Sequence, residues 1–216
     1  AGAVSELSTP FSLFGGRGGV TLRELITRVH TLLDDENVTA LILRVDGLEL
    51  SYAAAEELRA ALSAREKPIY CHIEDATDLT YMMLTACTSI GLAPTGTVAI
   101  TGPAVTPLYL RGLLDKLGIE TDFLHVGAYK GAAEPLTRDA PSAEMKETYQ
   151  ALLDGAYARL LDALAKGRHV ELARAQKWVD QALFTSTQAK AAGLVDDVNG
   201  FEAWRDKQVG EGQWLA

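Results

Sequence analysis

The sequence has few cysteines and no excess of basic residues, and each shortage excludes a class of protein. Cys71 and Cys87 do not make a disulfide framework, and neither belongs to a C-x-x-C pair. We therefore expect both to be small apolar residues of the core. The 20 basic residues are outnumbered by 29 acidic ones, which gives a net charge of −9. No nucleic-acid partner and no anionic membrane surface is expected, because a basic stripe is missing.

A membrane-spanning segment is also not expected. The stretch from Leu79 to Arg111 carries no charge before the arginine. Three prolines interrupt it: Pro94, Pro103 and Pro107. Buried strands and their turns explain this composition better than a transmembrane helix. No secretory signal opens the chain, and its start at Ala1-Gly2 predicts a processed or excised piece.

The order of apolar patterns predicts an α/β fold with a mostly parallel sheet and a helical carboxy-terminal part. Two capping boxes, Thr21–Glu24 and Thr185–Gln188, predict the starts of helices. The other expected helices cover residues 53–64, 79–88, 108–117, 149–164, 171–182 and 201–208. The expected strands cover residues 37–45, 68–73, 89–92, 98–100, 122–126 and 194–195. We divide the chain into a loop-like segment (1–20), an α/β domain (21–200) and a terminal helix with a tail (201–216).

Most catalytic motifs are absent. The sequence contains no G-x-S-x-G, H-E-x-x-H or S-x-x-K motif. The histidines are scattered without metal-ligand spacing, so no metal or cofactor is expected: His30, His72, His125 and His169. The glycine cluster at residues 15–19 is not a phosphate-binding Walker loop, since no lysine precedes a serine or threonine. A flexible surface loop is the better interpretation.

One lysine is a candidate for chemistry. Lys130 follows the expected strand 122–126 and is surrounded in the sequence by glycine, alanine and tyrosine. Burial among such groups disfavours the ammonium form, so a buried lysine can accept a proton from a serine hydroxyl. The same pattern is also typical of a solvated lysine at the end of a strand. On the residues alone, the solvated lysine is the preferred interpretation.

The segment "VGAYKGAAEPLTRD" (126–139) resembles the lysine-bearing segment of the signal peptide peptidase A (protease IV) family. The residue types that match are Gly127, Tyr129, Lys130, Ala132, Glu134, Pro135, Arg138 and Ser142. Other stretches agree in order and spacing, so the resemblance covers about Leu22 to Val198. It implies a crotonase/Clp-like spiral α/β fold. It also implies a Ser-Lys dyad serine endopeptidase that degrades cleaved signal peptides, with Lys130 as the general base.

The sequence departs from the family where the nucleophile is expected. Alignment places Asp78 at the serine position, and Asp46–Glu49 replaces the oxyanion-binding loop. A carboxylate cannot act as the serine does, and acidic groups repel an oxyanion. The hydroxyls of Thr77 and Thr80 are nearby, but neither is expected to be a nucleophile. The chain therefore resembles the lysine-bearing amino-terminal half of the long family members and is expected to be inactive alone.

The resemblance implies a homologous serine-bearing half or domain as the partner, in a homo- or hetero-oligomeric ring. Residues 108–110 and the helix 149–164 are candidates for contact with a neighbour, although core packing is the preferred interpretation of the helix. The substrates implied are extended apolar signal-peptide segments with small residues near the cut. The implied location is membrane-associated, with the catalytic part outside the cytoplasm and an anchor supplied upstream or absent.

Two other functions remain open at this stage. The chain is alternatively a non-catalytic scaffold or substrate-binding protein on the same fold, in which Lys130 is kept for structural reasons. A crotonase-type acyl-CoA enzyme is disfavoured, because the loop Asp46–Glu49 lacks an evident oxyanion nest. The basic residues that would bind the phosphates of coenzyme A are also not clustered in the sequence.

Overall fold

The computed structural model describes residues 21–64 and 66–210, which divide into two compact units. Unit 1 comprises the described residues up to Gly102 and from Leu160 onward, and unit 2 comprises Pro103–Arg159. The domain boundaries expected at residues 20 and 200 stay predictions. The glycine cluster at residues 15–19 lies outside the described residues.

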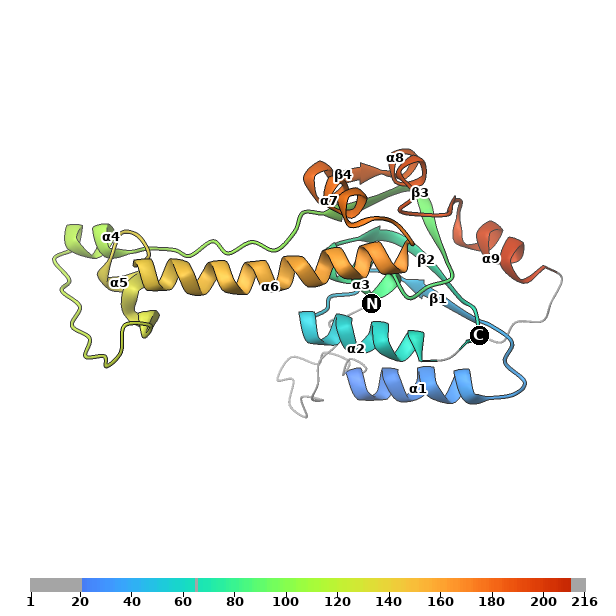
Figure 1. Cartoon of the computed structure of the whole chain (residues 1–216), viewed down its shortest axis with the longest axis horizontal. Coiled ribbons are helices and arrows are strands. Elements are labelled where there is room, and N and C mark those ends of the chain that lie inside the picture. The colour runs from blue at the N-terminus through green and yellow to red at the C-terminus, as the bar shows by residue number, and fades with distance from the viewer. Residues whose placement is uncertain (1–20, 65, 211–216) are drawn as a thin grey trace. The chain divides into compact units, whose positions relative to one another are not determined.

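Unit 1 is built on a five-stranded sheet in the order β1-β2-β3-β4, with β5 beside β3 (Figure 1). The strands are β1 (Leu41–Val45), β2 (Ile69–Ala76), β3 (Ser89–Ile100), β4 (Ala182–Thr185) and β5 (Asp197–Val198). All pairings are parallel except that of β3 with β4. The predicted α/β class with a mostly parallel sheet is confirmed.

Among the described residues, six helices lie wholly within unit 1. They are α1 (Leu22–Asp34), α2 (Tyr52–Ser63), α3 (Asp78–Leu84), α7 (Leu172–Gln181), α8 (Ser186–Ala192) and α9 (Phe201–Val209). Both predicted capping boxes form, at Thr21 and at Thr185. The Oγ1 of Thr21 accepts the N–H of Glu24 at 3.2 Å, and the Glu24 carboxylate accepts the N–H of Thr21 at 2.9 Å. These bonds satisfy amide groups that the first helical turn leaves free.

The terminal helix α9 belongs to the core of unit 1. Trp204 is fully buried and lies directly on Gly91, where an added Cβ would come within 2.4 Å of the indole Nε1. The ring of His72, which pairs with Gly91 across the sheet, lies 5.4 Å from the Trp204 ring. Its Nε2 donates to the backbone oxygen of Asn199 at 2.9 Å. The absence of a side chain at Gly91 of β3 therefore leaves room for the indole ring of α9.

Unit 2 contains short helices and the first part of a long one. It holds α4 (Arg111–Lys116), the 3-10 turn η1 (Gly131–Ala133), α5 (Glu134–Thr137) and residues 143–159 of α6 (Ala143–Gly167). The expected helix 108–117 is thus shorter at both ends. The expected strand 122–126 is wrong, since these residues form neither helix nor strand. A strand needs a neighbour for its backbone groups, and the described residues supply none there.

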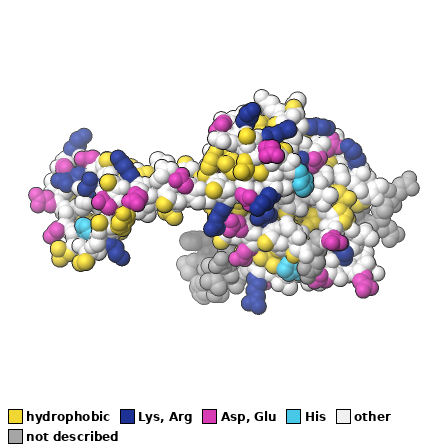
Figure 2. Space-filling model, viewed as in Figure 1, with side chains coloured by type: hydrophobic (Ala, Val, Ile, Leu, Met, Phe, Trp, Pro, Cys, Tyr) yellow, Lys and Arg dark blue, Asp and Glu magenta, His cyan; other side chains and the backbone are white. Residues whose placement is uncertain are grey.

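Large apolar side chains remain at the surface of unit 2, as Figure 2 shows for one face. They include Leu108, Leu113, Leu117, Leu124, Val126 and Leu152, exposed by 53% to 100%. The preferred interpretation of the helix 149–164 as plain core is therefore wrong in its first half. In α6, burial begins at Leu160, which lies in unit 1. No helix among residues 21–64 and 66–210 is both long and apolar enough to cross a bilayer.

Three further differences concern strands of unit 1. The expected strands 89–92 and 98–100 are one strand, β3, and the expected strand 194–195 lies instead at Asp197–Val198. Strand β4 was not predicted. It is four residues long and depends on antiparallel pairing with the second half of β3, which no local pattern indicates.

The expectation that the cysteines are unpaired core residues is also wrong. Cys71 of β2 and Cys87, three residues beyond α3, form a disulfide with their Cα atoms 6.0 Å apart. Both are buried. The cause is that the chain leads from α3 directly into β3, which pairs with β2. Cys71 of β2 is in register with Ile90 of β3, so the residues just before β3, Cys87 among them, come close to Cys71.

Reduction of the disulfide is expected to lower the stability of the chain. A bridge between positions 16 apart restricts the unfolded chain, which stabilises the fold by about 3 kcal/mol. Urea unfolding with and without dithiothreitol measures the difference. A Cys71→Ala/Cys87→Ala variant is the control, because its midpoint should not respond to the reductant. Equal midpoints for the oxidised and reduced native chain would contradict the prediction.

A buried carboxylate joins the last three elements of the fold. Asp197 of β5 accepts from Nζ of Lys190 at 2.9 Å and from Nζ of Lys207 at 2.5 Å. It also accepts the N–H of Val198 and the side-chain amide of Asn199, both at 3.0 Å. The hydrogen bonds from Lys207 and Lys190, in that order, hold the pKa of Asp197 well below its usual range. Asp197 thus links α8 and α9 to the sheet.

The contribution of Asp197 is expected to disappear in acid. Its folded pKa lies below the unfolded value of ~3.9, so its stabilisation is present above that value and decreases as the pH falls. At pH 7, Asp197→Asn should lower the free energy of unfolding by about 1–3 kcal/mol. Urea unfolding from pH 7 to pH 2.5 should show this difference shrinking. Asp206→Asn, at a well-exposed carboxylate, is the matched control and should change stability little.

Candidate functional site

The two segments that the resemblance assigns to the nucleophile and the oxyanion loop meet at one edge of the sheet. The loop Asp46–Glu49 follows β1, and Asp78 begins α3 just after β2. Because β1 and β2 are parallel neighbours, their carboxyl ends lie at the same edge, where open α/β sheets bind ligands. Contact between the two is direct, since Oγ1 of Thr80 donates to the backbone oxygen of Leu48 at 3.1 Å.

The carboxylate of Asp78 is fully engaged in hydrogen bonds. Its Oδ2 accepts from Oγ1 of Thr101 at 2.9 Å, and its Oδ1 accepts the N–H of Gly102 at 3.0 Å. These residues follow β3, and Gly102 is the last residue of unit 1 before Pro103. Asp78 therefore ties the end of β3 to the start of α3, a structural role at the position that the resemblance assigns to the nucleophile.

The edge is negatively charged around Asp78. The carboxylate of Asp46 pairs with Nε of Arg44 at 2.8 Å, while its Oδ1 is buried with no hydrogen-bond partner among the described residues. Burial, with further contributions from the carboxylates of Asp78 and Glu56, raises the pKa of Tyr52. A developing oxyanion would be repelled here, because stabilising it requires aimed N–H donors or positive charge.

The two threonine hydroxyls lie beside Asp78 without a base. Oγ1 of Thr77 and Oγ1 of Thr80 are 3.4 Å apart, and the Thr80 hydroxyl is directed to the Leu48 carbonyl. Among the described residues, neither hydroxyl bonds to a histidine or a lysine. An alcohol without an adjacent base is a weak nucleophile.

Lys130 lies in unit 2, at a turn and not at the end of a strand. Gly127 has φ 104°, a conformation that a residue with a Cβ rarely adopts, and its carbonyl accepts the N–H of Lys130 at 3.2 Å. Lys130 is exposed in this chain, which agrees with the solvated interpretation, but no strand precedes it. It lines a hollow of about 460 Å³ within unit 2. Ionisable side chains that share this hollow are Asp122, His125, Glu134, Arg138 and Glu144.

The residues that match the family segment build the frame of this hollow. Oε2 of Glu134 accepts the N–H of Ser142 at 2.9 Å, and the hydrogen bonds from Ser142 hold the pKa of Glu134 below its usual range. Oγ of Ser142 accepts the N–H of Met145 at 3.1 Å and so caps α6. The carbonyl of Pro135 accepts the N–H of Leu110 at 2.7 Å.

Sequence reasoning missed this role of Glu134 and Ser142. They are eight positions apart, which is no helical or strand period, so the only available signal is a serine directly before the long helix. The site residues divide between the units. Thr77, Asp78 and Thr80 lie in unit 1, and Lys130 lies in unit 2.

Comparison with known proteins then identifies the family. Residues 61–210 match the description "Peptidase family S49". The chain belongs to this peptidase family. It is 25% identical to "Serine protease SPPA, chloroplastic" of Arabidopsis thaliana over 83% of the chain, and 28% identical to "Protease 4" of Salmonella typhi over 81%. It is 25% identical to "Protease 4" of Haemophilus influenzae, again over 81%.

The predicted resemblance to the signal peptide peptidase A family is confirmed by these S49 relatives. The chain spans only 27%, 28% and 30% of the length of the three proteins. Its correspondence to the amino-terminal half of a long member stays a prediction, as do the roles of Lys130 and Asp78.

Removal of the Asp78 carboxylate is expected to free the end of β3. Asp78→Ala deletes the acceptor of the Gly102 N–H, which should cost about 1–3 kcal/mol locally. Hydrogen exchange of the Gly102 amide should therefore accelerate about tenfold or more. Asp115→Ala, which removes an exposed carboxylate of α4, is the control and should leave that amide unchanged. If hydrogen exchange of the Gly102 amide is unaltered in Asp78→Ala, the structural role of Asp78 is contradicted.

Proposed function

We propose that this chain contributes the lysine general base of a Ser-Lys signal peptide peptidase, with the serine supplied by a homologous half or domain. The observation that carries the proposal is the division of the site: the matched lysine segment frames a hollow, while the serine position holds a carboxylate with both oxygens bonded. Membership of peptidase family S49 supports the reaction class. The chain alone would be inactive.

In the proposed reaction, the neutral amine of Lys130 takes the proton of the partner's serine hydroxyl as the serine oxygen attacks the scissile carbonyl carbon. Donors of the partner half stabilise the oxyanion. The C–N bond then breaks, and the Lys130 ammonium returns the proton to the leaving amine. Water hydrolyses the acyl-enzyme with the same lysine as base.

The surroundings of Lys130 support a partner at this surface. Leu124 and Val126 are 100% and 92% exposed, and Tyr129 is 60% exposed although its hydroxyl donates to Glu147 at 2.8 Å. Apolar side chains so exposed are typical of an interaction surface. A homologous half that covers them would also bury the amine, and burial disfavours the ammonium form that cannot act as a base.

The substrates proposed are the apolar segments of cleaved signal peptides, bound in an extended conformation within an oligomeric ring. Extended peptides satisfy their backbone groups by strand-like pairing, which leaves alternate side chains to be read by pockets. A location on the outer side of a membrane is proposed on the same family resemblance.

Replacement of Lys130 is expected to abolish turnover in the assembled peptidase that contains this chain. Loss of a general base costs about 10²–10⁴-fold, so Lys130→Ala should reduce cleavage of a signal-peptide substrate by at least 100-fold. Size-exclusion chromatography should show an unchanged assembly. Lys116→Ala, at another exposed lysine of unit 2, should stay within twofold of the native activity.

A second measurement separates the half-site from its alternatives. Intact-mass analysis after treatment with a fluorophosphonate should find no adduct on this chain and one adduct on the serine-bearing half. An adduct on any serine or threonine of this chain would overturn the proposal and make it a self-sufficient hydrolase. Full activity of Lys130→Ala would instead favour the non-catalytic scaffold.

A further inference from the structure

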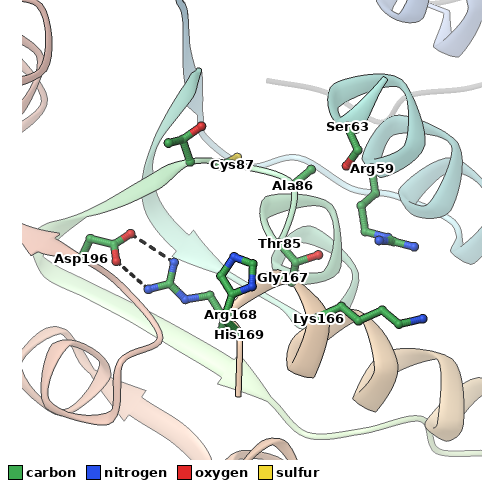
Figure 3. Close-up of a pocket in the computed structure, with 11 residues that line it drawn as sticks. Arg59, Ser63, Thr85, Ala86, Cys87, Lys166, Gly167, Arg168, His169 and Asp196 are labelled. Carbon is green, nitrogen blue, oxygen red and sulfur yellow. Dashed lines mark hydrogen bonds and ion pairs between the residues drawn. The ribbon is translucent and has the colours of Figure 1, made fainter. Parts of the chain in front are cut away.

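A second hollow lies at the opposite edge of the sheet from Asp78, entirely within unit 1. Its volume is about 630 Å³, and it forms where α2, α3 and α6 end (Figure 3). Helices α2 and α3 run back to the starts of β2 and β3, so their last residues lie at the amino ends of these strands. The hollow is therefore separate from the edge that the family resemblance assigns to catalysis.

The walls of this hollow are positively charged in an acidic chain. Its charged side chains are Arg59, Lys166, Arg168, His169 and Asp196. Arg168 is already occupied: Nε donates to the Gly193 carbonyl at 3.0 Å, and both Nη atoms donate to Asp196 at 3.1 and 2.6 Å. That bidentate pair cancels its charge. The remaining positive side chains of the hollow are Arg59 and Lys166.

Arg59 is the unusual member. Its Nε is shielded from solvent, and no acceptor among residues 21–64 and 66–210 bonds to it. A buried donor without an acceptor destabilises the fold, and more so when the group is charged. Figure 3 shows its side chain extending from α2 on the same side of His169 as Lys166. A ligand that brings acceptor oxygens would relieve this cost.

Lys166 is available to the same ligand. Its only ion pair among the described residues is with Asp162 at 2.9 Å, where the two side chains are 73% and 49% exposed. Such a pair contributes little and exchanges readily with solvent. Thr88 adds a hydroxyl: its Oγ1 accepts the N–H of Ile69 at 3.0 Å, which leaves its own proton free to donate.

The frame that carries these donors is closely packed. An added Cβ on Gly167 would lie 2.3 Å from Cβ and 2.4 Å from the carbonyl oxygen of Thr85, so α6 ends in direct contact with the end of α3. His169 follows with φ 52°, a left-handed conformation that few side chains adopt, and the N–H of Val170 bonds to the Ala165 carbonyl. The disulfide at Cys87 fixes the third wall.

We propose that this hollow is a binding site for a phosphate group, with Arg59 and Lys166 as its charged ligands. Phosphate oxygens accept several charge-assisted hydrogen bonds, which suits a guanidinium and an ammonium on separate helices. The volume exceeds that of one tetrahedral ion by a wide margin, since a water occupies roughly 30 Å³. A phosphate ester on a small molecule therefore fits as well as the free ion. The site is independent of the proposed peptidase function.

The test is the binding of phosphate to the full chain, measured as a rise in melting temperature and by calorimetric titration. Inorganic phosphate should raise the melting temperature in a saturable way, beyond sodium chloride at equal ionic strength. Arg59→Gln and Lys166→Gln should each weaken phosphate binding at least tenfold. Lys177→Gln, which removes an exposed charge of α7 outside the hollow, is the matched control and should stay within twofold.

Two ligand sources are distinguished by comparing inorganic phosphate with glycerol phosphate. Tighter binding of the ester indicates a small organic phosphate, and tighter binding of the free ion indicates inorganic phosphate; either supports the site. The proposal is overturned if phosphate gives no effect beyond chloride, or if it binds all three variants as it binds the native chain. Lys166 lies at an exposed helix end, so its variant should fold even if Arg59→Gln does not.

Discussion

Backbone pairing along β3 is the interaction on which unit 1 depends. This strand of 12 residues bonds to β2 in both of its halves, to β5 at Gly91 and Leu92, and to β4 from Thr97 to Ile100. Its ends define the two candidate sites. Thr88, just before the strand, lines the basic hollow, and Thr101, just after it, bonds to Asp78. At about 3.3 Å per residue, the strand separates the two sites by at most roughly 40 Å.

The charged side chains of unit 1 also differ between the two ends of the strands. At the carboxyl edge, Asp46 and Asp78 stand where the family resemblance expects a loop of N–H donors and a serine, and no oxyanion could be stabilised there. At the amino edge, cationic side chains gather where α2 and α6 end. Asp46 and Asp78, which exclude oxyanion stabilisation at the carboxyl edge, do not line the basic hollow at the amino edge. A single small sheet can thus present two opposite electrostatic environments.

Features that rest on local bonds could be predicted from the sequence, and features that rest on distant partners could not. Capping boxes at Thr21 and Thr185 predicted helix starts because their donors and acceptors are three residues apart. The apolar run 122–126 suggested a strand, but a strand exists only where another backbone pairs with it. The disulfide depended on α3 returning Cys87 to Cys71, a distance that sequence spacing does not report.

The candidate site was predictable to the same extent. Lys130 was found through a segment of matched residue types, because its neighbours Glu134 and Ser142 are needed to hold the turn whatever the chemistry. Its exposure agrees with the solvated interpretation that the residues alone favour. The basic hollow was missed entirely. Arg59 and Lys166 are 107 positions apart in the chain, and both line one hollow, where Gly167 packs on Thr85.

The burial of Trp204 against Gly91 has a consequence for the order of folding. Strands β1, β2 and β3 leave the ribosome early, but β4, β5 and α9 follow only after all of unit 2 has been made. Until then β3 lacks two of its three partners, and the face around His72 and Gly91 stays open to solvent. Nascent chains expose such surfaces for seconds at ordinary rates of synthesis. Until residue 201 and the rest of α9 have been synthesised, the incomplete sheet is therefore expected to be a substrate for chaperones that shield exposed strands.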